Sequence, residues 1–226
     1  MSLFEEHKDE RRKRILGAAR KLVVQSGYGG LTMRDLAKAA RVSVPTLYNL
    51  FGSKDAILVA ELEASATVLA SKIVPTSSFF SNGMAVFEAG MAQIESDPEF
   101  YRQVMRMALT STETVESRRR AEEAYIAIMA GNLAAAKAAG QLAPWAEPAI
   151  VARHMFALYM ACFLAWGMGE LDWPTFRAAA LSGICHLLVG VARGAFADEV
   201  EHRLIALLRD PPLTRFKEVR HASRRR

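Results

Sequence analysis

Residues that commonly carry catalysis or bind metals are few in this chain of 226 residues. It has two cysteines, Cys162 and Cys185, and five histidines scattered along the sequence. Neither set has the spacing of a disulfide framework or a metal site. The His-Glu-x-x-His, Gly-x-Ser-x-Gly, Gly-x-Gly-x-x-Gly and phosphate-loop signatures are also missing. We therefore expect no enzyme, metal ion or cofactor, and we expect both cysteines to be small buried apolar residues.

Strand signals and a secretory leader are missing as well. Apolar residues recur at helical rather than alternating spacing nearly throughout, which predicts an all-α chain. The N-terminal segment is charged and contains no long apolar run, so we expect a cytoplasmic protein. The apolar stretch Met155–Gly169 has 15 residues, short of the roughly 20 that cross a bilayer, and we expect no membrane span.

Positive charge is concentrated at the two ends of the sequence. Residues 1–55 carry a net +5, residues 56–214 a net −5 and residues 215–226 a net +5. A basic N-terminal segment is typical of proteins that bind duplex DNA. Within it, we hypothesise that the run Arg11–Arg14 contacts phosphates or the minor groove. The alternative is that these residues are only the solvent-exposed start of a helix, which would have the same sequence pattern.

Residues 32–58 carry three helix start signals in close succession. Thr32 opens a Thr-x-x-Asp capping pattern. Ser43 precedes a helix with Pro45 in its first turn, and Gly52-Ser53 ends that helix and begins a third. The middle helix is barely two turns long, so its neighbours must hold it in place. This organisation predicts a helix-turn-helix whose recognition helix leads into a longer support helix.

The segment from Arg14 to Leu58 resembles the DNA-binding region of the TetR family of bacterial transcription regulators. The resemblance rests on a first helix that ends in glycine (ILGAARKLVVQSGYGG), followed in order by Thr32, Leu36, Ala37, Val42-Ser43, Thr46-Leu47-Tyr48, Phe51 and Lys54. No single element is rare, but the order and spacing are specific. Two positions depart from the family pattern. Arg41 stands where a glycine is frequent in the turn, and Leu50 stands where a phosphate-contacting histidine is frequent.

The resemblance implies which residues contact DNA. The implied set is Thr32, Arg34, Ser43, Val44, Pro45, Thr46, Tyr48, Asn49 and Lys54. Val44, Pro45 and Asn49 would face base edges, and Tyr48 would reach bases or phosphate. Thr32, Thr46 and Lys54 would bind phosphates. We accordingly expect a DNA-binding domain at residues 1–58, a helical effector-binding and dimerisation domain at 59–210, and a basic, disordered tail at 211–226.

Two apolar helices are expected near residues 149–169 and 174–197. The second carries small residues at Ala179, Gly183, Gly190 and Gly194, which would let another helix backbone approach closely. The resemblance implies that the pair meets its mate in the four-helix interface of a homodimer. The residues alone also allow the pair to form the core of a single subunit.

Methionine and aromatic residues are frequent between Phe79 and Trp166, and most of them must be core. Methionine adapts to apolar ligands, and the resemblance implies an effector pocket among these middle helices. We therefore predict a bulky, apolar small-molecule effector. The candidate lining residues are Phe87, Met91, Met105, Tyr125, Met129, Tyr159 and Trp166.

These observations predict a homodimeric transcription regulator, a repressor that binds a palindromic duplex operator and is released by the effector. Two alternatives stay open. One is a DNA binder that acts without a ligand. The other is a helical protein-interaction adaptor that has lost its DNA, which Arg41 and Leu50 would favour.

Overall fold

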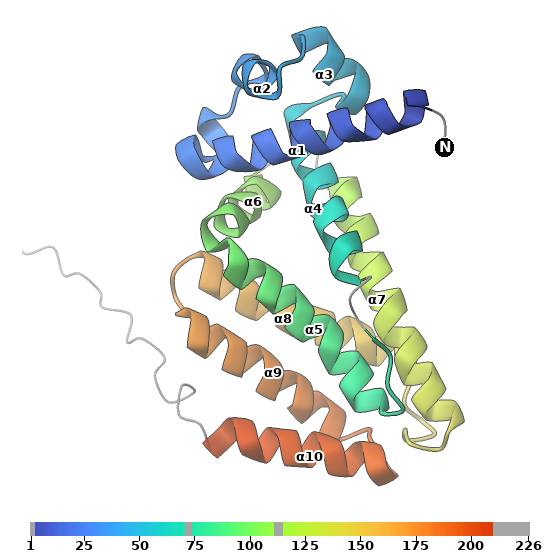
Figure 1. Cartoon of the computed structure of the whole chain (residues 1–226). Helices are drawn as coiled ribbons and strands as arrows, with labels where there is room; N and C mark the ends of the chain where they lie inside the picture. Colours follow the sequence, from blue (N-terminus) through green and yellow to red (C-terminus); the bar gives the residue numbers. More distant parts are fainter. Residues whose placement is uncertain (1–2, 71–73, 111–114, 210–226) are drawn as a thin grey trace, which may run out of the picture. The chain divides into compact units, whose positions relative to one another are not determined.

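The computed structural model describes residues 3–70, 74–110 and 115–209, and these residues form ten α-helices and no strand (Figure 1). The expected all-α fold is confirmed. The predicted basic tail at 211–226 lies outside the described residues. The helices are α1 (Leu3–Gly30), α2 (Met33–Ala40), α3 (Val44–Phe51), α4 (Lys54–Ala70), α5 (Phe79–Ser96), α6 (Pro98–Thr110), α7 (Val115–Ala138), α8 (Pro148–Gly167), α9 (Trp173–Val189) and α10 (Gly194–Arg209).

The chain divides into two compact units. The first comprises residues 1–72 and 96–121, and the second comprises residues 73–95 and 122–226. The first unit thus contains the predicted helix-turn-helix together with α4 and α6. The predicted boundary at residue 58 separates a DNA-binding region from an effector-binding region and was not a prediction of compact units. It stays a prediction.

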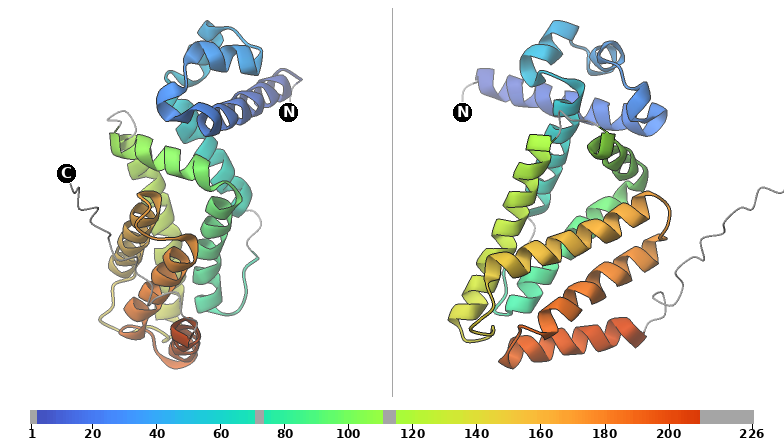
Figure 2. Two further views of the ribbon diagram at one scale, coloured as in Figure 1. Left: turned by 90° about the vertical axis from the view of Figure 1, so that its left-hand side faces the viewer. Right: turned by 180° about the vertical axis from the view of Figure 1, so that it is seen from behind.

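In the first unit, α1 packs against α2, α4 and α6, and α3 packs against α2 and α4. Figures 1 and 2 show α2 and α3 on one side of α1, with α4 and α6 on the other. One face of α1 supplies the core with Ile15, Ala19 and Val23, all with no exposed surface. Gly27, with φ 71° and ψ 167°, breaks the helical geometry near the end of α1.

The turn between α2 and α3 is built on Arg41, which adopts a left-handed conformation with φ 53° and ψ 50°. It is the only residue other than glycine with positive φ in the described part of the chain. Its N–H bonds the carbonyl of Lys38, and the N–H of Val42 bonds that of Ala37, which closes the end of α2. The turn therefore keeps the geometry that the family pattern gives to a glycine.

Replacing Arg41 by glycine should stabilise the protein. A left-handed conformation costs a non-glycine residue roughly 1–2 kcal/mol, and the greater flexibility of glycine in the unfolded chain offsets part of that gain. We expect the free energy of unfolding to rise by about 0.5–1 kcal/mol in urea denaturation. The control is Lys38→Gly, at an exposed position inside α2, which should lower it by about 1 kcal/mol. A loss of stability for Arg41→Gly would contradict this account.

In the second unit, α9 packs against α8 on one side and α10 on the other (Figures 1 and 2). The expectation of a single helix over 174–197 was wrong, because α9 ends at Val189 and α10 begins at Gly194. Between them the chain pairs with residues 141–143. The N–H of Ala143 bonds the carbonyl of Val191 at 2.7 Å, and the N–H of Arg193 bonds that of Gln141 at 3.0 Å. This non-local pairing ends a helix that the local pattern would have continued.

The helical spacing of Ala124, Ile128, Leu133 and Ala135 predicts that these four residues of α7 point inward, and for three of them this is wrong. Leu133 is buried, whereas Ala124, Ile128 and Ala135 are exposed. The buried face instead carries Ile126, Met129, Leu133 and Ala136. Alanine is plentiful on α7, so several faces have similar hydropathy and the pattern does not select one.

The close approach expected for the second apolar helix occurs at Gly183. A Cβ atom built there would lie 2.6 Å from Cδ2 of Leu158 on α8. Gly190 does not take part in the same way, because it follows the end of α9. The small residue at 183 therefore lets α8 and α9 pack closely within one subunit.

Candidate nucleic-acid interface

The recognition helix α3 is held by its two ends and by one buried side chain. The Ser43 hydroxyl accepts a hydrogen bond from the N–H of Thr46 at 3.2 Å, which caps the N-terminus, and Gly52 ends the helix. Leu47 is buried with no exposed surface. The predicted caps at Ser43 and, for α2, at Thr32 are confirmed.

The opposite face of α3 is open to solvent. Tyr48 is 52% exposed, and Asn49 and Pro45 are exposed beside it. An exposed tyrosine and asparagine on a short, anchored helix can offer hydrogen bonds and apolar surface to base edges in a major groove. Val44 and Thr46 are half-buried at the start of the same helix.

The predicted phosphate contacts differ in how available they are. Thr32 and Arg34 are exposed, but the Thr32 hydroxyl donates to Oδ2 of Asp35 at 2.5 Å. The Lys54 ammonium donates to the carbonyl of Tyr28 at 3.2 Å and lies 4.1 Å from the centre of its ring. Lys54 would therefore bind a phosphate either with its remaining donors or by leaving Tyr28. The resemblance implied the phosphate contact of Lys54, but nothing local in the sequence pointed to its contact with Tyr28.

A partly buried charge network joins three helices of the first unit. Arg20 on α1 donates to Oε1 of Glu61 on α4 and to Oδ2 of Asp97 before α6, each at 2.8 Å. Its guanidinium carbon also lies 4.2 Å from the centre of the Phe100 ring. Burial disfavours the charge of Arg20, but the hydrogen bonds to Glu61 and Asp97 outweigh it and raise its pKa. The network fixes the elements that carry the helix-turn-helix.

The predicted effector residues do not line one cavity. Phe87, Tyr125 and Tyr159 form an aromatic cluster in the second unit, with ring centres 5.3–6.4 Å apart. Trp166 continues it, 5.7 Å from Phe163, which in turn lies 6.4 Å from Tyr159. Met91 is buried elsewhere on α5. Met105 lies on α6 in the first unit, so it does not belong to this cluster.

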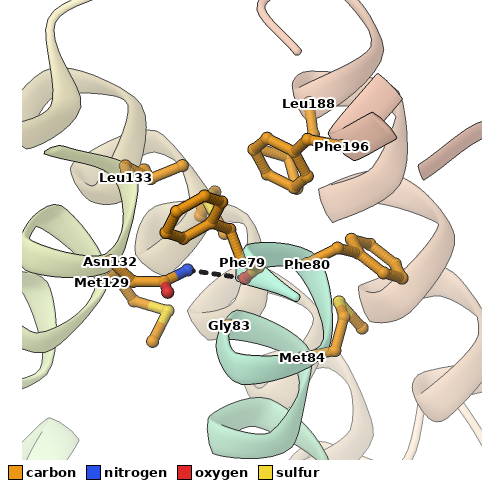
Figure 3. Close-up of a pocket in the computed structure, with 10 residues that line it drawn as sticks. Phe79, Phe80, Gly83, Met84, Met129, Asn132, Leu133, Leu188 and Phe196 are labelled. Carbon is orange, nitrogen blue, oxygen red and sulfur yellow. Dashed lines mark hydrogen bonds between the residues drawn. The ribbon is translucent and has the colours of Figure 1, made fainter. Parts of the chain in front are cut away.

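A small pocket lies at a different place in the second unit, and Met129 is the one predicted residue that lines it. Figure 3 shows side chains of several helices directed toward this space, with the Asn132 amide bonding the carbonyl of Phe79 at 2.7 Å. The remaining space is about 10 Å³, room for about one water molecule. Its lining residues are Phe79, Phe80, Gly83, Met84, Met129, Asn132, Leu133, Met155, Leu188 and Phe196.

The tyrosine at the centre of the aromatic cluster carries a polar atom that is cut off from solvent. The Tyr125 hydroxyl is buried and has no hydrogen-bond partner among the described residues. Burial, with a smaller contribution from Tyr159, raises its pKa far above the usual value. An unpaired buried hydroxyl costs roughly 1–3 kcal/mol, which a ligand with one suitably placed polar group would recover.

The apolar helix α8 is only partly covered by its own chain. It has 20 residues and is longer than the apolar stretch Met155–Gly169, so by length and composition alone it could cross a membrane; the expectation of no membrane span stays a prediction. Only 17% of its most apolar window is buried.

One face of α8 carries Ile150, His154, Ala157, Ala161 and Leu164, spaced alternately by four and three residues. The first four are exposed and Leu164 is half-buried. We call these five residues the outer face of α8.

The expectation of two buried cysteines is confirmed for Cys185 only. Cys185 on α9 is buried with no exposed surface, and Cys162 on α8 is half-buried. Burial raises the pKa of the Cys185 thiol to about 11 and also raises that of Cys162. Both thiols are therefore protonated near neutral pH and are weak nucleophiles.

Comparison with known sequences identifies the N-terminal region. Residues 15–60 match the family model described as bacterial regulatory proteins, tetR family. The transcriptional repressor KstR of Rhodococcus jostii is 49% identical over 53 residues, which cover 24% of this chain and 25% of KstR. The regulator HbdR of Aromatoleum sp. is 42% identical over 55 residues, which cover 24% of each chain. The match thus spans about a quarter of the length of these relatives.

Solved structures extend the similarity beyond the helix-turn-helix. SmeT, the repressor of the multidrug efflux pump SmeDEF of Stenotrophomonas maltophilia, aligns with a TM-score of 0.66 at 20% identity, over 82% of this chain and 92% of SmeT. A putative TetR-family regulator from Syntrophomonas wolfei aligns with a TM-score of 0.69 at 20% identity, over 80% of this chain and 96% of that one. Residues 15–60 thus match the sequence pattern of the tetR family of bacterial regulatory proteins, and most of the chain has the fold of solved regulators of this kind.

Proposed function

We propose that the chain is a transcriptional repressor that reads duplex DNA through α3. The observation that carries the proposal is the exposed pair Tyr48 and Asn49 on a two-turn helix whose opposite side is anchored by buried Leu47. The net charge of +5 on residues 1–55 supports it. So does the 53-residue match to KstR, which is named as a repressor.

Selection of bound duplexes from a random pool by the purified chain tests the proposal directly. A regulator of this kind should enrich one sequence, and a two-fold dimer should make that sequence a palindrome with half-sites about one helical turn or more apart. If no duplex is enriched at low salt, the chain does not read DNA and the adaptor alternative takes its place. Enrichment of a single, non-repeated half-site would contradict the dimer but leave DNA recognition intact.

Base and phosphate contacts should separate in two variants of the recognition region. Replacing Asn49 by alanine should cost about 1–3 kcal/mol on the selected operator and relax the preference at one base pair. Lys54→Ala should weaken binding to all sequences alike and reduce the slope of log affinity against log salt by about one unit. Both are measured by titration of fluorescent duplexes at several salt concentrations.

The control for these variants is their stability, because Lys54 also contacts Tyr28. Thermal unfolding should show little change for Asn49→Ala and a modest loss for Lys54→Ala. Equal, sequence-independent losses of DNA affinity for both variants would contradict the assignment.

We propose further that α8 and α9 form the dimer interface. The outer face of α8 supports this, because four of its five residues are exposed along a helix that is largely apolar, which leaves a row open to a second helix. A surface groove of about 240 Å³ continues this face at the start of α8. It is lined by Ile150, His154, Leu187 and Val191, and by Trp145, which is 69% exposed. A partner subunit on this surface would cover apolar side chains that a single subunit leaves open.

We propose that the effector is a bulky apolar molecule with one polar group, bound in the second unit near the aromatic cluster. The unpartnered Tyr125 hydroxyl supports the single polar group. FadR of Bacillus subtilis, which has a similar fold at a TM-score of 0.62 and 18% identity over 74% of this chain, was solved with stearoyl-CoA. A protein of this fold can thus bind a ligand that has a long acyl chain. Because the rings of this cluster are packed with their centres 5.3–6.4 Å apart, binding there requires aromatic side chains to move.

A linked titration tests release by such a ligand. An apolar compound that raises the melting temperature is added to the protein–operator complex, and operator affinity should fall by roughly 5–150-fold. By linkage, operator DNA should weaken ligand binding by the same factor. A tight ligand of the second unit that leaves operator affinity unchanged would favour the ligand-independent DNA binder.

A further inference from the structure

Arginines on α1 hold the C-terminal ends of both helices of the helix-turn-helix. Nη1 of Arg12 donates to the carbonyl of Leu50, in the last turn of α3, at 3.2 Å. Nε of Arg14 donates to the carbonyl of Ala40, the last residue of α2, at 2.9 Å. The last carbonyls of a helix lack partners within it and form the negative end of its dipole, so a cation placed there stabilises that end.

Arg12 makes a second contact with the end of α3. Its guanidinium carbon lies 4.4 Å from the centre of the Phe51 ring, so the planar group stacks on the last residue of the recognition helix. The last turn of α3 has no basic residue of its own. With eight residues, α3 is also too short to be stable without its neighbours.

The residues beside Arg12 have a different environment. Arg11 and Lys13 are exposed, whereas Arg12 is half-buried. The basic run Arg11–Arg14 is therefore not one uniform surface. Arg12 and Arg14 bind helix ends, and Arg11 and Lys13 face solvent.

We propose that Arg12 is a positioning residue for sequence recognition by α3, whereas Arg11 contributes only general attraction to phosphates. This inference rests on the proposed DNA-binding function. Base contacts require side chains held within roughly 0.5 Å and 10–20° of the correct geometry, and Arg12 fixes the end of the helix that carries them. Attraction to phosphates tolerates a tilted helix, so loss of Arg12 affects specific binding more than non-specific binding.

The DNA test compares Arg12→Ala, Arg12→Lys and the matched control Arg11→Ala on the selected operator and on a random duplex at several salt concentrations. Arg12→Ala should lower operator affinity about tenfold and random-duplex affinity less than about twofold. The slope of log affinity against log salt is measured on both duplexes, and the difference between the two slopes should be nearly the same as in the wild type. Arg11→Ala should lower both affinities by a similar factor and reduce the salt slope by up to about one unit.

Arg12→Lys separates positioning from charge, because lysine keeps the charge but not the planar guanidinium that stacks on Phe51. It should retain affinity for random duplex and still lose several-fold in operator preference. Recovery of wild-type preference by lysine, or equal losses on both duplexes for Arg12→Ala, would overturn the proposal. If Arg12→Ala does not fold, the lysine variant alone decides.

Hydrogen exchange provides a readout that needs no DNA. Amides of residues 47–52 should exchange about five- to tenfold faster in Arg12→Ala than in the wild type, because the end of α3 loses its cap. The same amides should be unchanged in Arg11→Ala. Unchanged exchange in Arg12→Ala would overturn the positioning role. If the wild type selects no duplex but exchange changes as expected, Arg12 caps α3 and the proposed DNA-binding function is wrong.

Discussion

Replacing Arg20 by alanine should lower the free energy of unfolding of the first unit by about 2–4 kcal/mol. The side chains of Arg20, Glu61 and Asp97 are 23%, 11% and 27% exposed, so the two ion pairs are partly shielded from water. Alanine removes the guanidinium from both carboxylates and from the face of Phe100 at once. The loss is smaller than for a fully buried network because water screens the charges of the partly exposed side chains.

Three comparisons make the Arg20 result specific. Arg20→Lys keeps the charge but not the fork that bonds two carboxylates, and it should lose roughly half as much. Lys21→Ala, at the exposed neighbouring position on α1, should change stability by less than about 0.5 kcal/mol. The measurement is urea denaturation followed by circular dichroism, with hydrogen exchange of α1, α4 and α6. A loss for Arg20→Ala no larger than that for Lys21→Ala would show that the network adds nothing.

Helix starts were predictable from the sequence because caps are local. Thr32 and Ser43 accept the expected amide hydrogen bonds, as does Ser53 from the N–H of Ala56 at 3.1 Å. Asp97 likewise accepts from the N–H of Phe100 at the start of α6. In each case the donor lies three residues after the acceptor, so a short stretch of sequence contains the whole interaction.

The interactions that fix these helices in space were not predictable, because their partners are far apart in the sequence. Arg20 bonds residues 41 and 77 positions away, and Arg12 bonds a carbonyl 38 positions away. In the sequence, Arg12 lies in the basic run Arg11–Arg14 and Arg20 stands beside Lys21, so both look like surface residues. The break between α9 and α10 has the same origin, because residues 141–143 pair with it from across the unit.

The candidate sites show the same division between local and distant information. The resemblance named the residues of α3, and the structure places Tyr48 and Asn49 in solvent as that assignment requires. The effector residues were chosen by side-chain type. That choice found the aromatic cluster around Tyr125, but it named only Met129 of the residues that line the pocket beside Phe79 and Asn132. The sequence could not locate the outer face of α8, because the helix is apolar nearly all round and every row along a helix has the same spacing.

Replacing Ala161 by glutamate should separate the proposed dimer. Ala161 lies in the middle of the outer face of α8, and a two-fold axis brings the same surface of both subunits together. The substitution therefore buries two unpaired charges, which should raise the dimer dissociation constant at least about 100-fold. Loss of the linked second half-site should weaken binding to the palindrome by about 100-fold or more.

The matched control is Ala135→Glu, the same substitution at an exposed position on α7, which should change neither association nor operator binding. Sedimentation gives the dimer constant, and titration of the full palindrome and of a single half-site gives the two affinities. Ala161→Glu should leave half-site affinity unchanged, because α3 is intact. If Ala161→Glu stays dimeric at wild-type concentrations, the outer face of α8 is not the interface. If it becomes monomeric yet binds the palindrome at full affinity, the two half-sites are not read by one dimer.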